Sequence, residues 1–167
     1  VILGAGAVGS TLASLLSQEN DLVVVDHNSS ELHRLEEEAD IKTLLGEVSY
    51  PNILVNAGIQ EADMVVAVTG SDETNIVACM IAKVLNKSVK TIARVREISY
   101  LKGKTKEAMD SGEIPVDIHI SPEQLITEHI QGLIEIPGSL QVMEFGQGKL
   151  NLVAVRAVEG GPMIGHE

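Results

Sequence analysis

The sequence predicts an α/β fold in which a doubly wound parallel sheet is followed by the start of a small α+β subdomain. Short apolar runs of strand length alternate with segments of helical periodicity, the pattern of repeated β-α units. Aromatic residues make up only 2% of the chain, so Val, Ile, Leu and Ala must build the core. That composition suits parallel strands that are buried on both faces.

The expected strands are short apolar runs bounded by polar residues or glycine. They lie at Val1–Leu3, Leu22–Val25, Ile41–Leu45, Met64–Val68, Thr91–Val95 and Val116–Ile120. Helices are expected between them, although the segment after the fifth strand is poorly patterned. The helix signals are apolar residues at helical spacing (Val8, Leu12, Leu15), capping serines (Ser29, Ser30), Pro51 with a stop at Ala57-Gly58, and Ser71-Asp72-Glu73 before a long helix to about Asn86.

The pattern changes after Ser121. A helix is expected from there to about Ile134, where Pro137-Gly138 ends it. Two strands and a hairpin loop should follow, at Leu140–Phe145, Gly146–Lys149 and Leu150–Val158.

We therefore expect a domain boundary near Pro137. Residues 1–136 would form the first domain, with the helix over residues 122–134 as a crossover helix. Residues 137–167 would begin a truncated second subdomain, because this stretch is too short to form its own core. We interpret the chain as a fragment of a longer protein, since it begins within an apolar run and without an initiator Met.

Composition and charge exclude several classes of function. The formal net charge of -12 disfavours nucleic-acid binding and direct docking on anionic lipid. A single cysteine, Cys79, cannot form an internal disulfide, which fits a reducing cytoplasm, and its apolar surroundings predict a core position. From these residues we expect neither a membrane-spanning helix nor a signal peptide.

The strongest motif is Gly4-Ala5-Gly6-Ala7-Val8-Gly9, a G-x-G-x-x-G. It follows a strand, opens a helix, and is followed 22 positions after Gly4 by Asp26, at the end of the next strand. This context is typical of the dinucleotide-binding turn of a Rossmann fold. A glycine turn made only for packing, with Asp26 as a helix cap, is the alternative.

Each position of the motif has a physical role. Gly4 permits the tight turn, Gly6 lets a pyrophosphate approach the backbone, and Gly9 lets the helix pack closely on the sheet. N–H groups of the loop and the helix dipole attract phosphates. The Asp26 carboxylate can accept from both ribose hydroxyls and would repel a 2′-phosphate. We therefore expect NAD(H), or an adenine nucleotide such as ATP or ADP, rather than NADP(H).

Further cofactor-binding residues are expected where other strands end, because open α/β sheets bind ligands beyond the carboxyl ends of their strands. Asp72 has two interpretations, a ligand contact or an acid that complements the helix dipole. Arg94 and Arg96 alternate on one face and suit phosphate, although a salt bridge is the alternative. The expected set outside the glycine motif is His27 beside Asp26, then Val68, Thr69, Gly70, Asp72, Arg94 and Arg96.

Candidate catalytic residues are missing from the sequence. Tyr100 and Lys104 have the Y-x-x-x-K spacing of short-chain dehydrogenases, but the segment is polar and the glycine pattern differs from that family. His119 and His129 are interpreted as structural, and no Cys/His metal pattern occurs. We expect neither an enzyme nor a metal site.

Several motifs together resemble the TrkA family of bacterial potassium-uptake regulators. The resemblance spans nearly the whole chain and is much more specific than the glycine motif alone. Its motifs are Gly4–Gly9, Val25-Asp26, Ala57–Asp63, Val66–Asn75, Ile92–Arg96, Ile120–Leu125, Ile134–Gly138 and Gly160–Gly165.

This resemblance implies a peripheral regulator on the cytoplasmic face of a Trk potassium channel. It would bind NAD(H), and also ATP or ADP, and would assemble as a homodimer or a higher ring. Thr69 and Asp72 would then line the cleft, and Arg94 and Arg96 would reach phosphates. Ala7-Val8 stands where some relatives have an arginine for a terminal phosphate, which favours NADH over ATP. Many relatives have a Gly-Asp pair after the third strand, near the adenine. This chain has Gly46-Glu47 there, so Glu47 keeps the negative charge with a longer side chain.

Three hypotheses follow. The first is a ligand-sensing regulatory subunit, the second an NAD-dependent oxidoreductase fragment without its substrate domain, and the third a nucleotide-stabilised scaffold. The missing catalytic residues and the family motifs favour the first. The nearly all-apolar helix over Thr74–Asn86 supports assembly, since a partner subunit or the C-terminal segment could cover it.

Overall fold

The structure is a computed structural model that describes residues 1–38, 40–145, 150–157 and 164. The chain divides into two compact units, Val1–Ser121 and Pro122–Glu167. The expected boundary near Pro137 stays a prediction. The helix that begins at Pro122 packs on the strand that follows it and is part of the second unit.

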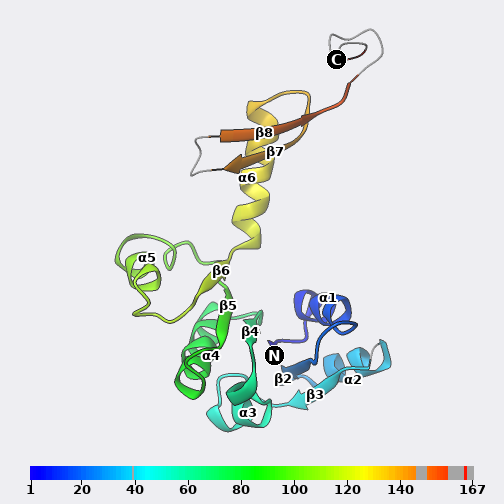
Figure 1. Ribbon diagram of the computed structural model, residues 1–167, viewed down its shortest axis with the longest axis vertical. Helices are drawn as coiled ribbons and strands as arrows, with labels where there is room; N and C mark the ends of the chain where they lie inside the picture. Colours follow the sequence, from blue (N-terminus) through cyan, green and yellow to red (C-terminus); the bar gives the residue numbers. More distant parts are fainter. Residues whose placement is uncertain (39, 146–149, 158–163, 165–167) are drawn as a thin grey trace. The chain divides into compact units, whose positions relative to one another are not determined.

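The first unit is the expected doubly wound α/β fold. Its described strands form one parallel sheet in the order β3-β2-β1-β4-β5-β6 (Figure 1). From β1, the chain adds β2 and β3 on one side and β4, β5 and β6 on the other, so the strand order reverses at β1. The strands are β1 (Ile2–Leu3), β2 (Val23–Asp26), β3 (Lys42–Leu45), β4 (Met64–Ala67), β5 (Lys90–Arg94) and β6 (Ile118–Ile120). The helices are α1 (Ala7–Leu16), α2 (Ser29–Glu38), α3 (Pro51–Asn56), the short 3-10 helix η1 (Ile59–Glu61), α4 (Asp72–Leu85) and α5 (Gly103–Asp110).

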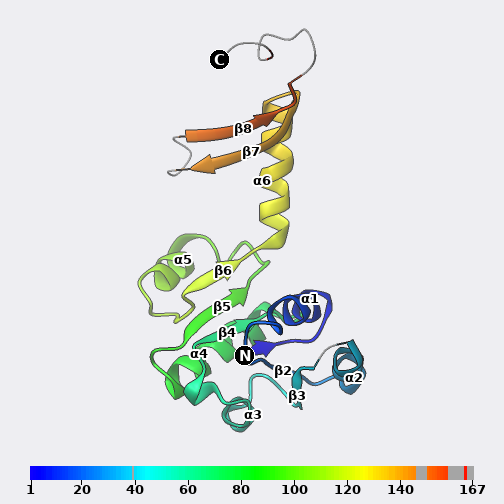
Figure 2. The same cartoon turned by 45° about the vertical axis from the view of Figure 1, so that its right-hand side comes forward.

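Helices cover both faces of this sheet (Figure 2). On one face, Ala13 of α1 and Leu32 and Leu35 of α2 pack with Ile2 and Val24 of the sheet. On the other face, a larger cluster joins α3, η1, α4 and α5 to the sheet. The central strands are therefore buried on both sides, which is why their sequence is continuously apolar.

Helix α4 presents one buried and one exposed side. Its residues Ile76, Ala78, Cys79 and Ala82 are buried in the core, whereas the Val84 side chain is 81% exposed. The core position of Cys79 is confirmed, and burial raises the pKa of its thiol to about 12. Coverage of the exposed side by a partner subunit stays a prediction.

The second unit is a helix packed on an antiparallel hairpin. It consists of α6 (Pro122–Glu135), β7 (Ser139–Phe145) and β8 (Leu150–Val155). Gly132 allows a close approach, because a Cβ there would lie 3.1 Å from the Cβ of Val142. The expected loop Gly146–Lys149, the end of the last strand at Val158, and all of the Gly160–Gly165 motif except Ile164 lie outside the described residues.

None of the helices in the described part of the chain is both long enough and apolar enough to cross a membrane.

Candidate nucleotide-binding site

A cavity of about 650 Å³ opens at the carboxyl ends of the strands where the strand order reverses. Its volume falls within the range of small-molecule sites, roughly 300–1,000 Å³. It is lined by Gly4, Gly6, Ala7, Val8, Asp26, His27, Asn28, Glu31, Glu47, Val48, Val68, Thr69, Gly70, Ser71, Thr74 and Arg94. Most residues that the sequence assigned to the cofactor are thus brought together from distant parts of the chain.

A second hollow of about 710 Å³ lies at the amino end of β6, beside Lys83 and Asp117. Asp117 accepts hydrogen bonds from the backbone N–H and the hydroxyl of Thr91, at 2.7 and 3.0 Å, and pairs with Lys83 at 2.7 Å. These bonds join β5, β6 and α4. Because ligands of open α/β sheets bind at the opposite, carboxyl ends of the strands, the first cavity is the candidate nucleotide site.

The glycine loop has the geometry that its motif predicts. Gly4 has φ +109°, and a Cβ there would lie 3.0 Å from the backbone N of Thr69. A Cβ on Gly9 would lie 1.8 Å from the carbonyl O of Gly4, so only glycine lets α1 approach the sheet this closely. No atom lies within 4 Å of a Cβ built on Gly6, which lines the cavity. Gly6 therefore leaves open the space that a phosphate group would need.

The start of α1 offers backbone donors that suit an anion. Gly6 is the N-cap, and the first N–H groups of a helix have no intrahelical acceptors. Ala7 and Val8 line the cavity at this helix end. The helix dipole adds a partial positive charge at the same place.

Asp26 fixes the loop as well as facing the cavity. Its Oδ2 accepts from the backbone N–H of Ala5 at 2.6 Å, and its Oδ1 accepts from that of Asn28 at 2.8 Å. The side chain is 12% exposed, and Nδ1 of His27 lies 3.3 Å from Oδ1. The alternative role of Asp26 as the cap of α2 is taken by Asn28, whose Oδ1 accepts from Ser30 N at 3.0 Å. The carboxylate can still accept from a ribose, because each oxygen has two lone pairs.

The charges of the cavity are divided between its two sides. On one side of β1, Asp26 ends β2, and Glu31 and Glu47 follow β2 and β3. On the other side, Arg94 ends β5. Three carboxylates on one side disfavour an additional phosphate on the ribose there. Sequence reasoning missed Glu31, whose position in the first turn of α2, five residues after Asp26, was the available signal.

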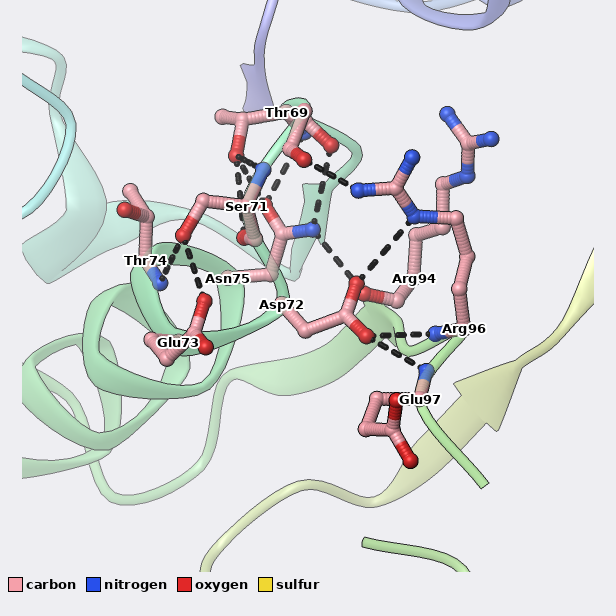
Figure 3. A network of polar contacts seen from close by, with 10 residues as sticks. Thr69, Ser71, Asp72, Glu73, Thr74, Asn75, Arg94, Arg96 and Glu97 are labelled. Carbon is pink, nitrogen blue, oxygen red and sulfur yellow. Dashed lines mark hydrogen bonds and ion pairs between the residues drawn. The ribbon is translucent and has the colours of Figure 1, made fainter. Parts of the chain in front are cut away.

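Asn75 is a second missed residue. It is fully buried in α4 and connects the ends of β4 and β5 (Figure 3). Its Oδ1 accepts from the N–H and the hydroxyl of Thr69 at 2.9 and 2.7 Å, and its Nδ2 donates to the carbonyl O of Arg94 at 2.9 Å. Asn75 thereby positions the cleft residues Thr69 and Arg94. The signal was present, because Asn75 closes the Val66–Asn75 family motif.

Replacing Asn75 with Ala should strongly destabilise the first unit. The substitution leaves the N–H of Thr69 and the carbonyl of Arg94 without their partner, and each buried unsatisfied group costs about 1–3 kcal/mol. We expect a loss of about 3 kcal/mol in the free energy of unfolding, measured by urea denaturation. Ser71→Ala is the control, since it removes the N-cap acceptor of Thr74 N and an exposed bond to Glu73 and should cost about 1 kcal/mol. Equal losses for the two variants would contradict this role of Asn75.

The structure does not place every expected residue in the cavity lining. The N–H of Ala5 is bonded to Asp26, and Gly9 packs beneath Gly4. Asp72 does not line the cleft as expected, because its carboxylate binds the backbone N–H groups of Arg96 and Glu97 at 2.7 Å each. Arg96 likewise lies outside the lining but donates to the carbonyl O of Gly70 at its rim. For Arg96, the alternative role of forming a salt bridge is the one observed, with Asp72 as the partner.

Residues with other catalytic interpretations lie elsewhere. Neither Tyr100 nor Lys104 belongs to the cavity lining, and Tyr100 packs against the core. His119 lies in β6 beside the second hollow. Within residues 1–38, 40–145, 150–157 and 164, no group of three or more His, Cys, Asp and Glu side chains could hold a metal ion.

The strand order, the glycine turn and the acidic residue at the end of β2 define a Rossmann-type domain. The chain belongs to the TrkA-N domain family, whose pattern matches residues 1–122. It is 49% identical over its whole length to the Trk system potassium uptake protein TrkA of Halomonas elongata, and 47% identical over 99% of its length to that of Vibrio alginolyticus. The chain covers 36% of the length of each relative.

Solved structures share the fold. The TrkA-N domain of the inner membrane protein ybaL from Escherichia coli superposes with a TM-score of 0.65 at 20% identity, over 81% of this chain and 93% of that one. GsuK bound to ADP gives 0.64 at 20% identity, over 82% and 34%. The GsuK channel bound to NAD gives 0.63 at 22% identity, over 84% and 26%.

Proposed function

We propose that this chain is the nucleotide-sensing part of a cytoplasmic regulatory subunit of a Trk-type potassium uptake system. In this proposal NAD(H) is the main ligand, and ATP or ADP bind as alternatives. The observation that carries it is the cavity that joins the glycine turn, Asp26 and the ends of β4 and β5 in a member of the TrkA-N family. The relatives named Trk system potassium uptake protein TrkA support the link to potassium uptake. The GsuK structures bound to NAD and to ADP support the ligand class.

The residues present fit a dinucleotide. The glycine loop and the start of α1 offer backbone N–H groups to a pyrophosphate, and Asp26 offers acceptors to a ribose. Glu31 and Glu47 add negative charge on the ribose side, which favours NAD(H) over NADP(H). The bound nucleotide would act as a signal, and we propose no chemical reaction on it.

The proposed partner is the membrane subunit of the Trk potassium channel. The regulator would lie on the inner face of the plasma membrane without inserting into it, and would act as a homodimer or a higher ring. The side of α4 that carries Val84 is exposed in a single chain and offers apolar area for such assembly. Nucleotide binding regulates the channel only if one conformation of the assembly binds the ligand better than another.

Potassium flux tests this function. The full-length protein and its membrane subunit would be reconstituted in vesicles, and flux would be measured with and without NADH. We expect NADH to change the flux with the wild-type protein and not with Gly6→Ala, whose methyl group would occupy the phosphate position. Ser14→Ala, on the exposed face of the same helix, should behave like the wild type. Flux that is independent of NADH, or steady NADH oxidation by the full-length protein, would contradict a regulatory function.

A further inference from the structure

The acidic residue Asp72 is more buried than its position requires. It is the first residue of α4, where an exposed acid would already be stabilised by the helix dipole. Its neighbour Glu73 is such an acid, and a bond from its own backbone N–H and one from the Ser71 hydroxyl lower the pKa of its carboxyl. Asp72 is instead only 6% exposed, and burying a charge is costly unless it is bonded. Its burial therefore calls for a separate explanation.

Asp72 binds the segment that follows β5. Its Oδ2 accepts from the backbone N–H groups of Arg96 and Glu97, both at 2.7 Å, and its Oδ1 lies 3.4 Å from Nε of Arg96 (Figure 3). Three donors converge on one carboxylate, which compensates its desolvation. The carboxylate thus joins the start of α4 to the chain leaving β5.

The arginine held by Asp72 reaches the cleft. The guanidinium of Arg96 donates to the carbonyl O of Gly70, and Gly70 lines the cavity between Thr69 and Ser71. Glycine is the residue whose backbone has the widest conformational freedom, so an external bond is an effective means of fixing this loop. Asp72 fixes Arg96, and Arg96 fixes Gly70.

The loop that contains Gly70 lines only the half of the cavity that lies on the β4 and β5 side of β1. In the strand order, β2 with Asp26 lies on one side of β1, and β4 and β5 lie on the other. A dinucleotide binds across the point where the order reverses. With its adenosine ribose on Asp26, a mononucleotide would occupy the β2 side and the glycine loop. The second nucleoside of a dinucleotide would continue towards Thr69 and Gly70.

We propose that Asp72 is a positioning residue that sets the preference of this site for a dinucleotide over a mononucleotide. It does not contact the ligand. It holds Arg96 on Gly70 and so fixes the part of the cleft that receives the second nucleoside. This inference rests on the proposed nucleotide binding and adds a residue that lies outside the cavity lining.

The test compares two ligands by calorimetric titration of the chain. NADH spans both halves of the cavity, whereas AMP contains only the adenosine half. For Asp72→Asn, which has nearly the same shape, we expect NADH affinity to fall about tenfold and AMP affinity to change by less than about twofold, a tenfold change being equivalent to about 1.4 kcal/mol. A purely structural loss would weaken both ligands equally.

Two further variants sharpen the test. Arg96→Gln should reproduce the selective loss for NADH, and the double variant should lose no more than either single one, since both act through one contact. Arg96 is 38% exposed, so this variant keeps the test available even if Asp72→Asn folds poorly. Glu97→Gln is the control: it removes a charge beside Arg96, leaves the backbone N–H on Asp72, and should bind both ligands normally.

The outcomes separate this inference from the proposed function. A selective loss of NADH affinity in Asp72→Asn and Arg96→Gln, absent in Glu97→Gln, would support the positioning role. Equal losses for NADH and AMP, or no loss for either, would overturn that role and leave nucleotide binding intact. A wild-type chain that binds neither NADH nor AMP would overturn the proposed function, and this inference with it.

Discussion

Gly9→Ala is expected to destabilise the first unit by about 3 kcal/mol or more. The new Cβ would lie 1.8 Å from the carbonyl O of Gly4, a backbone atom that cannot move without displacing β1 or α1. Overpacking a core typically costs about 1–3 kcal/mol, and this clash involves backbone on both sides. The gain in helix propensity from Gly to Ala, at most about 1 kcal/mol, does not offset it. Urea denaturation followed by circular dichroism measures the change.

Gly6→Ala is the matched control for stability. Gly6 has φ -65°, which alanine adopts freely, and the added Cβ would meet no atom within 4 Å. We expect its free energy of unfolding to stay within about 0.5 kcal/mol of the wild type, as for most substitutions away from packed features. The two glycines should thus differ sharply, with Gly9 needed for the fold and Gly6 for the ligand. A Gly9→Ala chain as stable as the wild type would show that α1 does not pack on Gly4 as described.

Asp26→Asn is expected to weaken nucleotide binding strongly while leaving the chain folded. Hydrogen bonds to charged groups contribute about 1.5–3 kcal/mol each, so losing the charged acceptor should weaken NADH binding at least about tenfold. Discrimination against NADPH should narrow at the same time, because a negative charge near the 2′-phosphate is removed. Parallel calorimetric titrations with NADH and NADPH measure both effects.

The structure also predicts a cost in stability for this variant. Each oxygen of the Asp26 carboxylate accepts one backbone N–H, from Ala5 or from Asn28. Asparagine keeps only one side-chain oxygen, so one of these two bonds is lost. One buried group would lose its partner, at about 1–3 kcal/mol. Glu31→Gln is the control for stability, since it removes the same charge from the same cavity and its carboxylate bonds Arg34 rather than a backbone N–H of the glycine loop. If NADH affinity is unchanged in Asp26→Asn, Asp26 does not bind the ribose and our assignment of the site is wrong.

The fold could be predicted from the sequence because its signals are local. Apolar runs, caps and the glycine spacing predicted the sheet of six parallel strands and its helices, and α5 was the element with the weakest pattern. The same signals predicted most of the cavity lining, since residues at the carboxyl ends of parallel strands must meet at one edge.

Side-chain partners could not be predicted in this way. Alternation along β5 and the residues after it indicates that Arg94 and Arg96 share a face, but not that Arg96 binds Asp72, 24 positions away. Nothing in the helical pattern of α4 indicates that Asn75 is fully buried or that it bonds Thr69 and Arg94. These contacts depend on how α4 packs against two strands, and a periodic pattern carries no information about them.

The central claim is that the cavity binds a nucleotide, with NAD(H) preferred. Calorimetric titration of the chain with NADH, NAD⁺, NADPH, ATP and ADP, with the size of each complex measured in parallel, tests it most directly. We predict micromolar binding of NADH, on the order of -8 kcal/mol, and exclusion of NADPH by the carboxylates of Asp26, Glu31 and Glu47. Equal binding of NADPH, or no binding of any of these nucleotides, would contradict the claim.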